Sequence, residues 1–153
     1  MELSYNSKIY VPQAYAYKCA TDFDLFESEG FGKLSKFEPR SEIRAPEIGA
    51  RWRTSAEFQG RPRNFSLQLL ELDGPGKLVL GNKSEKYDIE AHFNFDEVGA
   101  EETDFSFRLV AKAQSITAKL ILQTIQLARA RIESSMRADF EAMAMRMEDT
   151  FQG

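Results

Sequence analysis

The chain has 153 residues, of which 42% are hydrophobic and 29% are charged, and this composition excludes the disordered, collagen-like and membrane-spanning classes. A chain of this length predicts a single domain, here over residues 1–153. Lys and Arg number 20 against 24 Asp and Glu, a formal net charge of -4, so no surplus of cations is available for a phosphate backbone and nucleic acid is excluded as a partner.

The amino-terminal segment is predicted to form one strand followed by two short helices. Apolar residues alternate with polar ones over 3–11, which is typical of a strand with one buried face. Pro12 suits the first position of a helix, and the apolar residues over 16–23 recur every three or four positions. A second short helix is expected over 24–27, before Gly30-Phe-Gly32, which we interpret as a flexible lid.

From Glu42 onward the hydrophobic period is two, which predicts antiparallel strands. A strand over 51–58 places Trp52 and Thr54 on one face and arginines on the other, as in a half-buried sheet. Further strands are expected around 65–69, 78–80, 89–95 and 105–109. Because the turns between them are short, neighbouring strands are predicted to be antiparallel.

After Ala113 the period changes to 3.6, which indicates a helix. No Gly or Pro interrupts residues 112–151, so one helix of roughly 35 residues and about 50 Å is predicted. Such a helix is longer than a small domain is wide. Its last apolar residues, Met143, Met147 and Phe151, are therefore expected to project and to be covered by a second copy, as a homodimer through the carboxy-terminal helix.

Local motifs accompany this order of elements. The segment Ile9-Tyr-Val-Pro-Gln-Ala-Tyr-Ala-Tyr-Lys-Cys-Ala-Thr-Asp22, the Gly49 turn before Trp52, the Leu-Asp-Gly-Pro-Gly hairpin at 72–76 and the turn over 99–103 occur in sequence. With them the chain resembles the polyketide cyclase/dehydrase and lipid-transport superfamily (SRPBCC), which is related to START domains and to the birch-pollen allergen. The resemblance covers essentially the whole chain and carries no catalytic signature.

The resemblance implies an α+β helix-grip fold. In this fold a curved antiparallel sheet of about six to seven strands wraps around a long carboxy-terminal helix, with two short helices after strand one. Members of the superfamily typically enclose an apolar cavity between sheet and helix, which we expect to measure a few hundred Å³. Strand alternation and the helix stripe select as cavity-lining residues Trp52, Thr54, Phe58, Phe65, Phe93, Phe105, Phe107, Leu120 and Thr124.

Groups with reactive side chains are few. His92 is the only histidine and alternates onto the face opposite the expected cavity, and Cys19 is the only cysteine, so neither a disulfide nor a His/Cys metal site is predicted. Asp22 and Asp24 flank a predicted helix start and are interpreted as capping residues. No catalytic residue, metal or cofactor is therefore assigned.

Together these patterns predict a protein that binds or carries a hydrophobic or amphipathic small molecule. A cyclase/dehydrase-type enzyme using the same cavity, with a Thr, Tyr or Arg assisting proton transfer, is the alternative, and a protein-interaction module built on the projecting helix is a third hypothesis. The amino terminus has no apolar stretch typical of a secretion signal, and no segment is apolar enough for stable membrane insertion, so a cytoplasmic location is expected.

Overall fold

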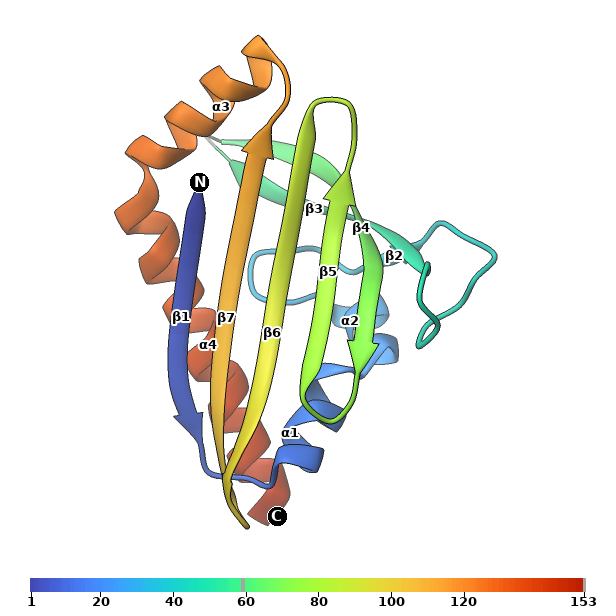
Figure 1. The fold of residues 1–153 in the computed structure, drawn as a ribbon, viewed down its shortest axis with the longest axis vertical. Helices are drawn as coiled ribbons and strands as arrows, with labels where there is room; N and C mark the ends of the chain where they lie inside the picture. The colour runs from blue at the N-terminus through green and yellow to red at the C-terminus, as the bar shows by residue number, and fades with distance from the viewer. Residues whose placement is uncertain (59, 153) are drawn as a thin grey trace.

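A computed structural model describes residues 1–58 and 60–152 and contains one curved antiparallel sheet, shown in Figure 1. Its seven strands lie in the order β1-β7-β6-β5-β4-β3-β2. The strands are β1 (Glu2–Ile9), β2 (Glu38–Pro39), β3 (Arg51–Phe58), β4 (Arg61–Asp73), β5 (Lys77–Lys83), β6 (Tyr87–Gly99) and β7 (Glu102–Ala113). Each strand from β3 to β6 is hydrogen-bonded to the next strand in the chain, because only short turns join them.

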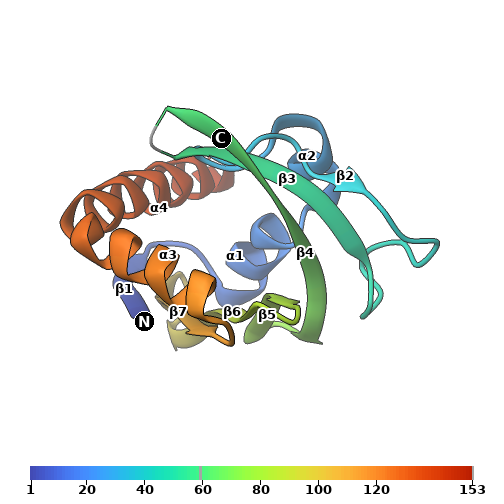
Figure 2. The same ribbon diagram turned by 90° about the horizontal axis from the view of Figure 1, so that it is seen from above.

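Four helices accompany the sheet: α1 (Gln13–Ala20), α2 (Phe23–Glu29), α3 (Ile116–Leu127) and α4 (Arg129–Gln152). Seen from above in Figure 2, the sheet bends around α1 and α4, which lie on its concave side. This is the helix-grip arrangement that the sequence predicted. The short strand β2 was not predicted, because it lies inside the long loop-like region before residue 46 and has only two residues.

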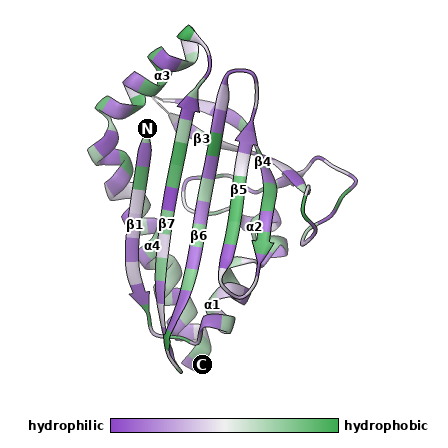
Figure 3. Ribbon diagram, viewed as in Figure 1, coloured by the Kyte–Doolittle hydropathy of each residue, from purple (hydrophilic) through white to green (hydrophobic). Residues whose placement is uncertain are grey.

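The predicted alternation along the strands is confirmed by their register. Trp52 pairs with Leu67 and Thr54 with Phe65, while Phe93 pairs with Phe107, so these side chains share the concave face. Figure 3 shows the corresponding alternation of hydrophobic and hydrophilic positions along the strands. His92 pairs with Val79 and lies on the opposite, convex face, as expected from the alternation.

The core beneath α4 is a cluster of aromatic rings around Phe140. The rings of Tyr5, Phe31, Phe93, Phe105 and Phe107 surround it, with centroid distances from 4.9 Å for Phe107 to 6.4 Å for Phe93. Tilted and edge-on contacts of this kind stabilise a core beyond the area that they bury. In this part of the molecule the space between sheet and helix, where a cavity was predicted, is filled by side chains.

The carboxy-terminal helix is not continuous, which corrects the prediction of a single helix. At Ala128 the backbone has φ -94° and ψ 11°, and its N–H is bonded to the carbonyl of Ile125, three residues back rather than four. Figure 1 shows α3 and α4 inclined to each other at this point. The break lets α3 contact β7 while α4 crosses the concave face, two contacts that one straight helix cannot make on a strongly curved sheet.

The end of α4 does not project, which is a second correction. Met143 and Met147 are buried in the main core, among Ile9, Val11 and Ala16. The ring of Phe151 lies 5.1 Å from that of Tyr15 in α1. The segment between β1 and α1 and the helix α1 therefore cover Met143 and Met147, while Phe151 stays 36% exposed, so most of the reason for a homodimer is lost.

Candidate functional site

The concave face is packed at one end and incompletely covered at the other. Along β4, β5 and β6, the inward-facing Leu69, Leu78 and Phe95 are fully buried. Further along the same strands, the side chains that face the same way are only half-buried: Phe65, Leu67, Leu80, Ala91 and Phe93. We call this second set the open end. Four of its members, Leu67, Leu80, Ala91 and Phe93, pack against the core with part of their apolar surface left exposed.

Trp52, predicted to line the cavity, is packed under α2, although its cross-strand partner Leu67 belongs to the open end. Its ring is stacked on Phe23 of α2, with centroids 5.2 Å apart and planes inclined by 25°, and it lies 6.3 Å from the ring of Phe37. The residue is almost completely buried. Contact between Trp52 and a ligand stays a prediction, while its packing against α2 is that of a core residue.

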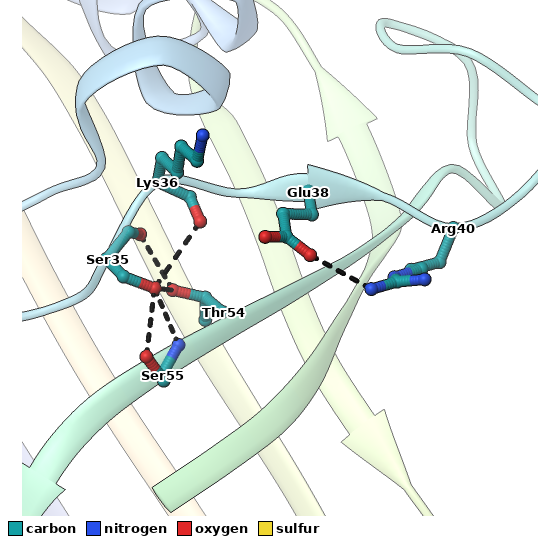
Figure 4. A network of polar contacts seen from close by, with 6 residues as sticks. All are labelled: Ser35, Lys36, Glu38, Arg40, Thr54 and Ser55. Carbon is teal, nitrogen blue, oxygen red and sulfur yellow. Dashed lines mark hydrogen bonds and ion pairs between the residues drawn. The ribbon is translucent and has the colours of Figure 1, made fainter. Parts of the chain in front are cut away.

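Thr54 is also inward-facing, but its hydroxyl is engaged within the fold. It donates to the carbonyl of Ser35 at 2.8 Å and lies 3.2 Å from the Ser35 hydroxyl, which also accepts from the backbone N–H of Ser55 at 2.9 Å (Figure 4). This network fixes the loop after α2 to β3. A ligand would have to displace one of these bonds to reach the Thr54 hydroxyl.

The same loop carries Gly30-Phe-Gly32, which was interpreted as a flexible lid. Phe31 and Leu34 exchange backbone hydrogen bonds of 3.2 and 2.8 Å, and Gly30 and Gly32 have φ of 77° and 55°. The Phe31 ring packs 5.7 Å from Phe140. The segment is a hydrogen-bonded turn that joins α2 to the core under α4, rather than an unattached flap.

The predicted aromatic residues divide between the two ends. Phe105 and Phe107 are buried in the cluster around Phe140, whereas Phe93 lies at the border of the open end and Phe65 belongs to it. Phe58 belongs to β3, but its side chain lies outside the described part of the chain. The open end also contains Leu67, Leu80 and Ala91. The same alternation places them inward, but the sequence prediction selected mainly aromatic residues and therefore did not include them.

The structure corrects the two predictions on the helix. Leu120 is 59% exposed, and Thr124 is exposed with its hydroxyl bonded to the carbonyl of Leu120 at 3.1 Å. The predicted apolar stripe assumed one continuous helix. Because the helix breaks at Ala128, the apolar positions of α3 no longer lie on the same side as those of α4. In α3 the side facing the molecule carries Ala118, with Leu122 and Ile125 half-buried beside it.

Two polar grooves open at the surface of the protein. One, of about 530 Å³, lies between β1 and α4 and is lined by Ser4, Tyr5, Asn6, Ser7, Arg137 and Glu141. The other, of about 360 Å³, lies over β3, β4 and β5 beside β2, with Arg40, Arg51 and Lys83 at its walls, and its lining also includes Trp52 and Leu67. Neither groove has the apolar lining that is usual for a small-molecule site.

Two titratable side chains near the core, Cys19 and Tyr17, have raised pKa values. Burial raises the pKa of the Cys19 thiol and of the Tyr17 phenol, so neither ionises at neutral pH. The Tyr17 hydroxyl donates to the carbonyl of Lys77 at 3.2 Å. Asp22 accepts from the backbone N–H of Leu25 at 3.1 Å, which confirms its predicted role as a helix cap.

The described residues were also compared with the requirements of a metal site and of a membrane-spanning helix. Within the described part of the chain, no three His, Cys, Asp or Glu side chains lie together in a way that could hold a metal ion. No helix there is both long and apolar enough to cross a bilayer.

Comparison with known proteins gives structural matches alone. No family model matches the chain, and no curated protein matches its sequence. Among solved structures, the aromatase/cyclase of Streptomyces sp. R1128 is similar with a TM-score of 0.71 and 13% identity, over 97% of this chain and 93% of that one. Norcoclaurine synthase of Thalictrum flavum, in complex with dopamine and hydroxybenzaldehyde, gives a TM-score of 0.70 and 8% identity, over 97% of this chain and 87% of that one.

A START superfamily protein of Mycobacterium smegmatis is similar at a TM-score of 0.60 and 12% identity, over 87% of this chain and 94% of that one. These neighbours confirm the helix-grip fold and the structural resemblance that the sequence motifs indicated. At such identities they establish the fold, and the fold alone does not assign a function.

Proposed function

We propose that this protein binds a hydrophobic or amphipathic small molecule at the open end of the concave face. The observation that carries the proposal is the difference in burial along single strands. Leu69, Leu78 and Phe95 are fully buried, whereas Leu67, Leu80 and Phe93, which face the same way, are not. A folded chain gains free energy by covering such apolar surface, and a bound apolar molecule would supply that cover.

Hydrogen bonding supports binding rather than catalysis. The hydroxyls of Thr54 and Thr103 each donate to a backbone carbonyl at 2.8 Å, and Tyr17 donates to another at 3.2 Å. A general acid or base has to exchange a proton with its substrate from a position within hydrogen-bond reach of it. Hydroxyls already bonded to the backbone serve the fold.

Solvent extraction of the purified protein followed by mass spectrometry would identify a retained molecule. The site itself is tested with the fluorescent probe anilinonaphthalene sulfonate and the variant Leu67→Gln, which puts an amide at the open end. We expect this variant to bind the probe roughly tenfold more weakly, because the amide must give up water when the probe covers it.

The control variant is Leu120→Ser, which changes an apolar residue on the outer side of α3. It should bind the probe as the unmodified protein does. Circular dichroism checks that both variants are folded. Equal binding by the unmodified protein and Leu67→Gln, or a loss confined to Leu120→Ser, would contradict a site at the open end.

A cyclase-type enzyme is the second candidate, favoured by the shared fold with an aromatase/cyclase. In that case the open end would hold a reactive chain in a folded conformation, and positioning would supply most of the acceleration. The test is the appearance of aromatic absorbance when the protein is mixed with a linear poly-β-ketone. A rate no faster than that of the ketone alone contradicts this candidate and leaves the binding function standing.

A further inference from the structure

The outer side of α3 carries a stripe of large apolar side chains. Ile116 is 80% exposed, Leu120 59% and Leu127 91%. Positions 116, 120 and 127 lie on one side of an α-helix, because the successive spacings of four and seven residues are close to whole turns. Ala118, on the opposite side, is 1% exposed and faces the molecule. We call Ile116, Leu120 and Leu127 the outer stripe.

This stripe is peculiar to α3. Half of the 12 residues of α3 are Ile or Leu, so the helix has apolar side chains both toward the molecule and away from it. The neighbouring helix α4 buries Phe140, Met143 and Met147 and presents charged residues such as Arg137 and Glu141 to solvent. Contiguous exposed apolar residues on a folded protein mark a surface that another apolar phase or partner covers.

Along the sequence, the charged residues from 105 to 132 have one sign, although Asp88 of β6 lies opposite Lys112 of β7 in the sheet. No Asp or Glu occurs between Asp104 and Glu133, while Lys112, Lys119 and Arg131 are exposed in this interval. The whole chain has a net charge of -4, so the segment is locally basic on an acidic protein. An apolar stripe with cations beside it is the pattern of helices that lie in the surface of an anionic membrane.

We propose that α3 docks the protein on the surface of an anionic lipid bilayer, with the outer stripe among the acyl chains and Lys119 and Arg131 near the lipid headgroups. The helix is about 18 Å long and would lie parallel to the membrane plane. A second copy of the chain fits this surface less well. Two α3 helices packed face to face would bring their Lys119 side chains near each other with no carboxylate from either α3 to pair with them.

The docking surface and the ligand site are separate. The outer stripe points away from the molecule, whereas the open end of the concave face lies on the inner side of the sheet. Binding to a bilayer through α3 therefore does not require a ligand, and the two proposals can fail independently.

The test is flotation of the full-length protein with vesicles of phosphatidylcholine containing phosphatidylglycerol, compared with vesicles of phosphatidylcholine alone. We expect binding to the anionic vesicles and its loss at high salt. Leu120→Ser should weaken binding roughly tenfold, as expected when one Leu no longer enters an apolar phase. The matched control is Ile48→Ser, because Ile48 is likewise 59% exposed and lies in the loop between β2 and β3, across the molecule from α3 (Figure 1).

Charge is tested separately. The double variant Lys119→Gln, Arg131→Gln should bind anionic vesicles more weakly by roughly fivefold for each cation removed. The control Lys18→Gln, Lys36→Gln changes the net charge equally at exposed positions on α1 and after α2 and should bind as the unmodified protein does. Circular dichroism and unchanged probe binding at the open end show that each variant is folded.

Three results would overturn the proposal. One is equal flotation of Leu120→Ser and Ile48→Ser. Another is binding that does not depend on phosphatidylglycerol. The third is a dimer in sedimentation velocity that Leu120→Ser dissolves, which would assign the outer stripe to a second copy of the chain. Failure to bind the fluorescent probe at the open end would instead contradict the proposed ligand function and leave membrane docking in place.

Discussion

The helices α3 and α4 follow one another in the chain and share a helical hydrophobic period, yet they use it in opposite ways. In α4 the apolar side chains are directed to the sheet, where Phe140 is surrounded by aromatic rings. In α3 the side facing the sheet buries the small Ala118, and the large side chains of Ile116 and Leu127 face solvent. The comparison shows that the period predicts a helix, while tertiary packing decides which side of it is buried.

The largest expected effect is at the centre of the α4 core. Phe140→Ala should destabilise the protein by about 3–5 kcal/mol, because it removes a buried ring and leaves a cavity among rings that cannot all collapse into it. Urea denaturation followed by circular dichroism measures the change. A loss below about 1 kcal/mol would mean that the core under α4 is not well packed, and the contrast with α3 would disappear.

The turn that holds Phe31 against Phe140 provides the next test. Gly30 has φ 77°, and a Cβ there would clash with the carbonyl oxygen of Leu34, whereas Gly60 has φ 75° and a Cβ there would meet nothing within 4 Å. Gly60→Ala carries only the left-handed penalty of about 1–2 kcal/mol. Gly30→Ala adds a steric clash and should cost roughly 1–3 kcal/mol more. Similar midpoints in urea for the two variants would show that the turn is free to move.

A smaller loss is expected at the open end of the concave face. Phe65→Ala removes a half-buried ring and should cost about 1–2 kcal/mol, well below Phe140→Ala. The same variant should weaken binding of anilinonaphthalene sulfonate. If its loss of stability equals that of Phe140→Ala, the two ends are equally packed, and the observation behind the proposed function is removed.

Substitution in the outer stripe should leave the isolated protein almost unchanged. Leu127 is 91% exposed, so Leu127→Ser should alter the free energy of unfolding by no more than about 0.5 kcal/mol. Urea denaturation without lipid is the measurement. A large destabilisation would show that Leu127 packs against the protein in solution. The outer stripe of α3 would then not face solvent, and the contrast with α4 would be smaller.

The smallest expected effect depends on pH. Burial raises the pKa of Tyr17, so the folded state holds the phenolic proton more tightly than the unfolded chain does. This contribution to stability is complete below the unfolded pKa near ~10 and is lost as the pH rises through the higher folded pKa. Tyr17→Phe should therefore lose less stability between neutral and strongly alkaline pH than the unmodified protein. An identical pH profile for both would contradict this.

The strands and their facing were determined locally. Period-two alternation predicted which residues of β3, β4, β6 and β7 face inward, and the register of Trp52 with Leu67 and of Phe93 with Phe107 agrees. The capping role of Asp22 was also predictable, because a cap depends on residues three positions apart. Side-chain alternation and capping are properties of the backbone geometry of a few neighbouring residues, so the sequence alone contains them.

The division of the concave face was decided by tertiary contacts. Alternation treated Trp52, Phe65 and Phe105 alike, but the first packs under α2, the third packs under α4, and Phe65 is left half-buried. Which side chains remain partly uncovered depends on where the helices cross the sheet. That crossing involves residues far apart in the sequence, which no local pattern specifies.

Local patterns predict the helix-grip order of elements, the inward and outward faces of the strands, and a helical segment after β7. Long-range packing sets the break of this segment at Ala128, the burial of Met143 and Met147 by the chain itself, and the exposure of Leu120 to solvent. The physical reason is that a hydrophobic period fixes the spacing of apolar residues along a helix, whereas the curvature of the sheet fixes how much of that helix it can cover.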